Sequence, residues 1–349
     1  MTVNRKLKIM YVDTSTDGHH LVYLNSLLQA ASEESFAVLP EHEGEVEGRC
    51  IEISGLVLRT FSGYRAWMKS LKEIADREAP DAIHFLNGDS IMRYFGMGLG
   101  QFRKYKTVMT FHHLFPGKLR EISMKSMLHQ VGAGVFHTEV IKQTVGEYGC
   151  KNIHCIPYPC FLNTPIQPGQ GYQNEPPVLL ALGGTRHDKG LDILLEAMKF
   201  VNQPFRLIIA GKEEDIKKAE IERQIQTYRA QVELKLCFLT DKEVLGYLQK
   251  SDIIVLPYRK EFDGASGPMC EGIYLGKTII GPNHGSLGQL IPRYHVGYTF
   301  ESENVMKLAE CLNHALKKAR IYDETARKEQ EELNPVLFQE RYIGLYEKI

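Results

Sequence analysis

The chain has 349 residues, 43% of them hydrophobic and 24% charged, a globular composition for which two domains are the expectation. Its formal net charge of -1 gives no field that attracts a polyanion, which argues against nucleic acid as the main partner. No apolar run reaches the roughly eighteen residues of a membrane-spanning helix, and the one that ends before Asp13 is too short for a secretion signal.

The seven cysteines are scattered along the chain and odd in number, which favours a reducing compartment. Cys150, Cys155 and Cys160 lie around His154, but no two of them have the spacing of structural zinc ligands. We therefore interpret the cysteines as buried free thiols and expect a cytoplasmic protein.

Short apolar runs alternate with helix-length segments along the chain. This alternation predicts an α/β architecture with mostly parallel sheets that helices cover on both faces. Because ligands of such sheets bind beyond the carboxyl ends of the strands, the residues after each run are the informative ones. The expected strands are residues 8–12, 82–86, 107–111 and 134–137 in the first half, and 178–182, 206–210, 232–238, 253–257 and 278–281 in the second.

Three further segments bear on the organisation of the chain. Residues 118–128 have the pattern of an amphipathic basic helix; a solvated helix face is its commoner explanation, and peripheral membrane contact stays an open alternative. Residues 163–177 are rich in Pro, Gly and Gln and are interpreted as an interdomain linker. Residues 334–349 carry an apolar stripe at helical spacing that needs a partner surface, formed by Phe338, Tyr342, Leu345 and Tyr346.

The first candidate site is the segment 182–197, which runs from a buried strand through a glycine turn into an amphipathic helix. Gly183 and Gly184 let the backbone approach a phosphate, Arg186 offers a bidentate fork, and Lys189 adds a mobile charge. An ordinary strand-to-helix turn with solvated charges explains the spacing equally well. The Gly-x-Gly-x-x-Gly dinucleotide fingerprint is absent.

The second candidate is the segment 256–281, where a loop of small residues enters a helix whose free N–H groups suit phosphate or sugar oxygens. Asp263 and Glu271 are separated by seven residues, and each is able to accept hydrogen bonds from sugar hydroxyls. The alternative makes Asp263 a turn former and Glu271 a surface charge. The loop residues expected to contact a ligand are Gly264, Ala265, Ser266 and Gly267, with Ser266 as the helix cap.

In this order and separation, the two segments resemble the C-terminal domain of retaining glycosyltransferases of the GT-B fold, family 4 in particular. The resemblance implies that Lys189 and Arg186 contact the diphosphate of a nucleotide-sugar donor, with Gly184 beside them. It also implies that Asp263 binds the donor sugar and Glu271 the nucleotide ribose. At the first of these positions the family has Glu, and the shorter Asp here bears on which sugar fits.

The N-terminal half is similar to the same family over shorter motifs. Gly18 stands in a segment that looks like the family's glycine loop, and His112 follows a buried strand where the family has a His near the transferring sugar. Leu239 stands where the nucleobase rests in the family. A metal cluster of His19, His20, His113 and His137 is not expected, since these residues lack a carboxylate at ligand spacing.

The resemblance implies two Rossmann-like domains facing a cleft, with residues 1–165 on the acceptor side and residues 178–330 on the donor side. Residues 331–349 are then a helix that crosses back onto the N-terminal domain. The expected activity is transfer of a sugar with retention from a nucleoside-diphosphate sugar to a glycan or lipid-linked acceptor, in surface polysaccharide or glycoconjugate assembly. No cofactor or metal is expected, because Arg186 and Lys189 neutralise the diphosphate and the chain has no Asp-x-Asp triad.

Two alternatives stay open. One is a non-catalytic GT-B subunit that acts through a protein partner, motivated by Asp263 and by the incomplete glycine loop. The other is a sugar-nucleotide epimerase on the same fold, which needs additional acid and base groups.

Overall fold

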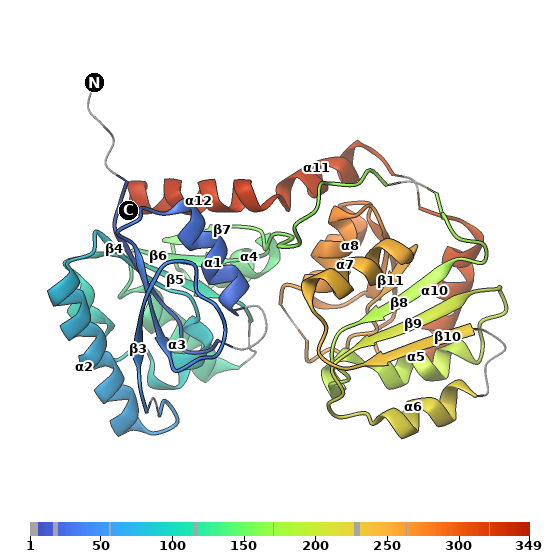
Figure 1. Ribbon diagram of the computed structural model, residues 1–349, viewed down its shortest axis with the longest axis horizontal. Coiled ribbons are helices and arrows are strands. Elements are labelled where there is room, and N and C mark those ends of the chain that lie inside the picture. Colours follow the sequence, from blue (N-terminus) through green and yellow to red (C-terminus); the bar gives the residue numbers. More distant parts are fainter. Residues whose placement is uncertain are drawn as a thin grey trace. The chain divides into compact units, whose positions relative to one another are not determined.

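The structure of the protein is a computed structural model that describes residues 6–16, 20–55, 57–114, 117–169, 171–226, 231–262, 264–320 and 322–349. The chain divides into two compact units (Figure 1). Unit 1 comprises Met1–Pro157 and Pro335–Ile349, and unit 2 comprises Tyr158–Asn334.

Unit 1 is built on a seven-stranded sheet in the order β3-β2-β1-β4-β5-β6-β7, in which all neighbouring strands are parallel. Its strands are β1 Ile9–Val12, β2 Phe36–Pro40, β3 Arg49–Ile53, β4 Ala82–Phe85, β5 Lys106–Phe111, β6 Ala133–Phe136 and β7 Ile153–Cys155. Its helices are α1 His20–Ala30, α2 Phe61–Glu78, α3 Lys118–Leu128, α4 Glu139–Glu147 and α12 Pro335–Lys348, with the short 3-10 helices η1 Gly88–Tyr94 and η2 Leu99–Phe102.

Unit 2 is built on a six-stranded parallel sheet in the order β10-β9-β8-β11-β12-β13. Its strands are β8 Val178–Leu182, β9 Arg206–Gly211, β10 Gln231–Leu236, β11 Ile253–Val255, β12 Thr278–Pro282 and β13 Gly297–Phe300. Its helices are η3 His187–Lys189, α5 Leu191–Met198, α6 Lys218–Ile225, α7 Asp241–Lys250, α8 Gly267–Tyr274, α9 Gly285–Arg293, α10 Val305–Lys317 and α11 Glu324–Glu332.

The strand order reverses once in each sheet, between β1 and β4 in unit 1 and between β8 and β11 in unit 2. Crevices for ligands in open parallel sheets form at such switch points, beyond the carboxyl ends of the strands. The two predicted segments of unit 2 follow β8 and β11, which are hydrogen-bonded neighbours. The expected α/β architecture is therefore confirmed, and it brings these two segments to one edge of one sheet.

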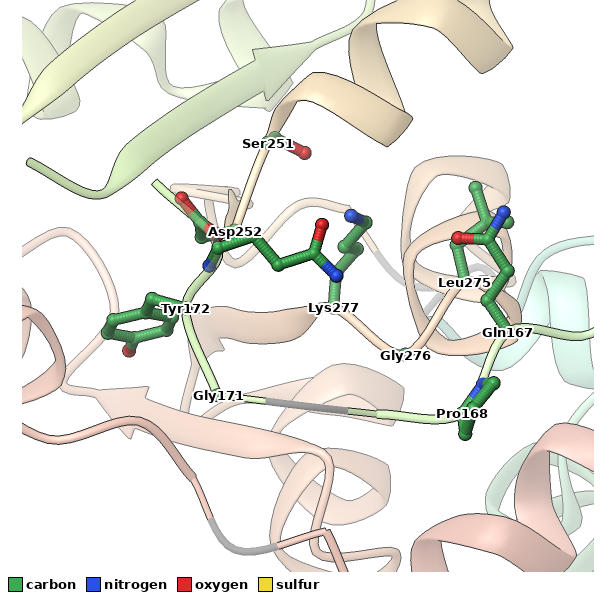
Figure 2. A pocket seen from close by; sticks show the side chains of 10 residues that line it. Gln167, Pro168, Gly171, Tyr172, Ser251, Asp252, Leu275, Gly276 and Lys277 are labelled. Atoms are coloured by element: carbon green, nitrogen blue, oxygen red, sulfur yellow. Dashed lines mark hydrogen bonds between the residues drawn. The ribbon is translucent and has the colours of Figure 1, made fainter. Parts of the chain in front are cut away.

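The segment 163–177, interpreted from its composition as a free linker, is instead packed within unit 2. The buried Asp252 carboxylate accepts hydrogen bonds from the backbone N–H of Gln173 (2.7 Å), the Asn174 side chain (2.9 Å) and the Val178 N–H (2.9 Å). These polar residues are fixed by one buried acceptor rather than by apolar burial, so their composition did not reveal the packing. Figure 2 shows Gly171, Tyr172 and Asp252 around a small cavity of about 200 Å³ at the amino ends of the strands.

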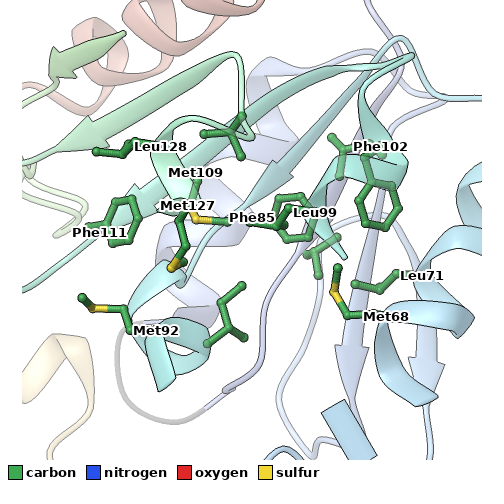
Figure 3. Packing of buried hydrophobic residues seen from close by; sticks show 14 of the residues in the cluster. Met68, Leu71, Phe85, Met92, Leu99, Phe102, Met109, Phe111, Met127 and Leu128 are labelled. Atoms are coloured by element: carbon green, nitrogen blue, oxygen red, sulfur yellow. The ribbon is translucent and has the colours of Figure 1, made fainter. Parts of the chain in front are cut away.

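Each unit has an apolar core between its sheet and its helices. In unit 1, Phe85 and Met109 on the sheet pack with Leu71 of α2, Phe102 of η2 and Met127 of α3 (Figure 3). The core of unit 2 is formed mainly by Leu, Ile and Ala side chains of β8, β9, β11, α5 and α10. Within the described residues, no helix combines the length and the apolar character needed to cross a membrane.

Helix α12 belongs to unit 1, although all of unit 2 precedes it in the chain. The predicted stripe of Phe338, Tyr342, Leu345 and Tyr346 is buried. The Tyr342 hydroxyl lies 2.5 Å from that of Tyr23 and 2.9 Å from Thr110 Oγ1. Tyr346 Oη lies 2.7 Å from Nδ1 of the buried His84. A polar network at the centre of the stripe therefore fixes the register of α12 on unit 1.

Candidate functional site

The turn after β8 and the loop after β11 meet at Gly190. This glycine has φ +63°, a left-handed conformation, and a Cβ placed on it would lie 2.1 Å from the carbonyl oxygen of Pro257. A side chain at this position would therefore push the two segments apart. Only glycine fits both the backbone conformation and the close approach.

Arg259 joins the two segments further. Its backbone N–H donates to the Asp188 carbonyl oxygen (2.9 Å), and its Nε donates to the His187 carbonyl oxygen (3.0 Å). Its guanidinium also pairs with Asp192 on α5. The backbone around Lys189 is therefore held by the loop on the neighbouring strand.

Arg186, the first predicted cation, forms a bidentate pair with Asp188. The Nε–Oδ1 distance is 2.9 Å and the Nη2–Oδ2 distance is 2.6 Å. This hydrogen bond raises the pKa of the Arg186 guanidinium above its usual value. The Arg186 side chain is half exposed, so an incoming phosphate is able to compete with Asp188 for the same fork.

Lys189, the second predicted cation, lies between two aromatic rings. Its Nζ is 3.9 Å from the ring centroid of Tyr258 and 3.9 Å from that of Phe262. Burial of the ammonium, with the nearby Arg186 charge, lowers the pKa of Lys189 to about 7. We call Tyr258 and Phe262 the aromatic cage of Lys189.

The loop after β11 ends at the N-terminus of α8. Ser266 caps this helix by accepting from the Met269 N–H (3.4 Å), and Pro268 occupies its first turn. Burial raises the pKa of Glu271 to about 7, and a Cβ on Gly267 would lie 3.9 Å from Glu271 Oε1. Glu271 is therefore a partly buried carboxyl beside the first turn of the helix, not the surface charge of the alternative interpretation.

The remaining predicted positions of unit 2 are distributed as follows. Leu239 is partly buried after edge strand β10 and precedes α7, which Thr240 caps. Gly264 is buried and Ala265 is partly buried. Asp263, like Gly18 of unit 1, lies outside the described residues.

Glu214 is a site residue that the sequence analysis missed. A Cβ placed on Gly184 would lie 1.9 Å from Glu214 Oε2, so this carboxylate packs directly on the predicted glycine. The Glu214 N–H donates to Thr185 Oγ1 (2.7 Å), and the Glu214 charge acts to raise the pKa of both Arg186 and Lys189. The available signal was its position just after β9, at the carboxyl edge of the sheet.

In unit 1, His112 follows β5 as predicted, at the carboxyl edge of that sheet. His112 Nε2 lies 2.8 Å from the Leu86 carbonyl oxygen, and the His112 N–H donates to Asp89 Oδ2 (2.7 Å). Its ring packs against those of Tyr23 (5.5 Å between centroids) and His137 (5.1 Å). A ring from α1 and a ring from the residue after β6 therefore pack against His112.

Asp89, after β4, is a second residue that the sequence analysis missed. Its Oδ2 also accepts from the His113 N–H (3.2 Å), whereas its Oδ1 is buried without a hydrogen-bond partner. Burial raises the pKa of this carboxyl to about 7. A buried polar atom without a partner needs an explanation, and at this edge of the sheet a polar ligand group would provide one.

One correction concerns the histidines of unit 1. His20, expected to lack a carboxylate partner, has its Nδ1 3.0 Å from Asp13 Oδ2. The two residues are seven apart in the sequence, and the sequence analysis did not pair them. Across the described ranges, no group of three or more His, Cys, Asp or Glu side chains is arranged to hold a metal ion.

Comparison with solved structures identifies the architecture. Sucrose-phosphate synthase from Thermosynechococcus elongatus is 16% identical with a TM-score of 0.73, and 98% of each chain is covered. HepE of Anabaena, solved with UDP and glucose, is 12% identical with a TM-score of 0.74 over 98% of this chain and 100% of that one. The lipopolysaccharide outer core galactosyltransferase WaaB is 13% identical with a TM-score of 0.74 over the same shares. At these identities the likeness shows the fold, which is GT-B.

Two sequence comparisons also match glycosyltransferases. An uncharacterized glycosyltransferase of Methanocaldococcus jannaschii is 27% identical over 135 residues, 38% of this chain, and the match spans only 36% of the length of that relative. Residues 164–332 match the family model described as glycosyl transferases group 1. The part of the chain that carries Lys189 and the N-terminus of α8 therefore lies inside the region that matches this glycosyl transferase model.

Proposed function

We propose that this protein is a glycosyltransferase whose unit 2 binds a nucleoside-diphosphate sugar and whose unit 1 binds a glycan or lipid-linked acceptor. The observation that carries the proposal is the joint position of Arg186, Lys189 and the N-terminus of α8 at the switch point of unit 2, inside the matched family region. Two cations and a helix N-terminus form a site suited to a diphosphate.

The proposed reaction proceeds with retention, as the resemblance to family 4 implies. The acceptor hydroxyl oxygen bonds to the anomeric carbon, the bond from that carbon to the phosphate oxygen breaks, and the hydroxyl proton passes to the departing phosphate. Negative charge grows on the leaving group, and Arg186, Lys189 and the backbone N–H groups of residues 264–267 stabilise it. In this scheme the protein's own cations neutralise the diphosphate without a metal ion, and Asp263, Glu271 and His112 contact donor groups.

The donor half of the proposal is tested by thermal unfolding with UDP, GDP, ADP, CMP and NAD, with magnesium and with EDTA. A ligand at a hundred times its Kd stabilises a fold by about 2.7 kcal/mol. We expect one nucleoside diphosphate to raise the Tm, with the same effect in EDTA. Absence of any shift would favour the non-catalytic subunit instead, and a shift with NAD alone would favour a cofactor-dependent epimerase.

The phosphate contact is tested by Lys189→Ala. We expect turnover of the nucleotide-sugar to fall about 100-fold or more, because one charged contact to the leaving group is lost. Folding is checked by circular dichroism. Near-normal turnover in a folded variant removes Lys189 from the proposed site.

We also propose that α3 contacts an anionic membrane surface, where lipid-linked acceptors reside. Leu119 and Ile122 of this helix are 72% and 53% exposed, and the neighbouring Lys118 and Arg120 are exposed too. Apolar side chains flanked by cations bind the interface of anionic bilayers. Co-sedimentation with anionic vesicles should be lost in Leu119→Glu/Ile122→Glu; equal binding by this variant would reject the contact.

A further inference from the structure

We propose that Tyr258 and Phe262 are positioning residues that hold the Lys189 ammonium ready for the donor diphosphate. The inference rests on the proposed function, since it takes Lys189 as the phosphate contact. Its basis is the geometry of the cage, in which both ring centroids lie 3.9 Å from the same nitrogen atom. A cation on an aromatic face is attracted by the ring quadrupole.

The cage is rigid because its rings are themselves held. Tyr258 is 2% exposed, and its hydroxyl lies 3.2 Å from Oγ of Ser266, the cap of α8. The Tyr258 and Phe262 rings contact each other edge to face with centroids 4.6 Å apart. The cage therefore couples the position of Lys189 to the helix N-terminus, the other half of the proposed phosphate site.

An aromatic cage leaves the lysine available in a way that an ion pair does not. Among the described residues, no carboxylate lies within ion-pair distance of Lys189, whereas Arg186 is paired with Asp188. Ring faces attract the ammonium without accepting a strong hydrogen bond from it. Its N–H groups then bind an incoming phosphate without first giving up a carboxylate partner.

The burial of Lys189 in the aromatic cage also predicts how diphosphate binding depends on pH. The charged groups that act on Lys189 are Arg186, which lowers its pKa, and Asp188 and Glu214, which raise it; burial dominates and leaves the pKa at about 7. A bound diphosphate favours the protonated lysine. Above pH 7 binding therefore takes up a proton, and affinity for the diphosphate falls as the pH rises.

The test is calorimetric titration of UDP, GDP and ADP into the full chain between pH 6 and 9. The variants are Phe262→Leu, which removes one ring face, Phe262→Tyr, which keeps it, Lys189→Ala, and Phe262→Leu/Lys189→Ala. The matched control is Tyr247→Leu on α7, which removes a different ring, one whose centroid lies 5.5 Å from Nζ of Lys250. All variants are compared with the wild type for heat of binding, Kd and proton uptake in two buffers.

At pH 6.5 we expect Phe262→Leu to weaken binding roughly threefold to tenfold, the effect of ordering one freed long side chain on binding. Phe262→Tyr and Tyr247→Leu should bind like the wild type. The double variant should bind no more weakly than Lys189→Ala. Phe262→Leu should also bind without proton uptake at pH 7.5, because opening the cage returns the lysine toward its ordinary pKa.

Each failure has its own pattern. If no nucleotide binds the wild type, or if Lys189→Ala binds as tightly, the proposed function fails and the cage fails with it. If Lys189→Ala weakens binding but Phe262→Leu does not, or if the two losses add, only the cage is rejected. If Phe262→Leu fails to fold, wild-type proton uptake and the Phe262→Tyr titration decide, and absence of uptake at pH 7.5 overturns the proposal.

Discussion

The candidate site depends on the absence of a Cβ atom at Gly190. An alanine there adopts the left-handed conformation at a cost of about 1–2 kcal/mol and also meets the Pro257 carbonyl. We expect Gly190→Ala to lower the Tm of unit 2 by at least about 2 °C in calorimetry and to weaken nucleotide binding, because the turn and the loop separate.

Gly246 provides the matched control. It lies in α7, where an added Cβ would meet no neighbouring group within 4 Å, so Gly246→Ala should stabilise the helix by about 0.5–1 kcal/mol. Equal Tm values for the two alanine variants would mean that the close approach at Gly190 carries no cost.

The raised pKa of Asp89 predicts how the stability of unit 1 depends on pH. A free Asp has a pKa near 3.9, and burial raises that of Asp89 to about 7 in the folded protein. The folded state therefore binds the proton more tightly, so stability present below pH 4 is lost as the pH rises to about 7. Asp89→Asn should flatten this fall in the Tm of unit 1; an unchanged slope between pH 5 and 8 would contradict it.

At the residue scale, the sequence predicts which side chains lie at the carboxyl edge of a sheet better than it predicts which other side chains they contact. Arg186, Lys189 and His112 follow strands and were found because the carboxyl edge of a parallel sheet is predictable. Glu214 follows a strand too, but only the fold brings its carboxylate onto Gly184. The cage of Lys189 depends on a loop about seventy residues later in the chain, and no local pattern predicts that contact.

At the scale of elements, the contribution of α12 to the stability of unit 1 is tested by a conservative substitution at Tyr342. Tyr342→Phe removes the hydroxyl that lies 2.5 Å from the Tyr23 hydroxyl and 2.9 Å from Thr110 Oγ1, so two buried hydrogen bonds are lost. The expected loss is about 1–3 kcal/mol. Trp67, the single tryptophan of the chain, is buried in unit 1 and reports its unfolding by fluorescence.

The control is Tyr247→Phe at a half-buried tyrosine of unit 2, which should leave the Trp67 transition at its wild-type temperature. A Tyr342→Phe variant with the wild-type transition would mean that the network does not hold α12. His84, whose pKa burial lowers to about 3, stays neutral across the range of such an experiment.

Among the described strands, the sequence analysis missed β2, β3, β7 and β13. The last three lie at sheet edges, whereas β2 is a buried interior strand whose apolar run was overlooked. Edge strand β3 is mostly exposed or half-buried, and β7 has three residues, so neither has a continuous apolar run. The buried strands β1, β4, β5, β8 and β9 were all predicted. The segment 163–177 was misinterpreted because Asp252 holds it through hydrogen bonds, which composition does not record.

At the scale of the whole molecule, the two units give separate signals. The proposed phosphate contacts all lie in unit 2, whereas Trp67 lies in unit 1. A stabilising nucleotide should raise the calorimetric transition of unit 2 by more than it raises the Trp67 fluorescence transition. Equal shifts would mean that the units unfold together or that unit 1 contributes equally to binding.

The place of α12 in the chain sets an order for biosynthesis. Unit 2 is one uninterrupted stretch, but unit 1 begins before it in the chain and is completed by residues 335–349, which are translated after unit 2. Until those residues emerge, His84 and Thr110 have no Tyr346 and Tyr342 to bond, and the aromatic surface around Tyr23 is uncovered. Unit 1 therefore completes its fold only after unit 2 has been translated, and until then its uncovered apolar surface is open to aggregation.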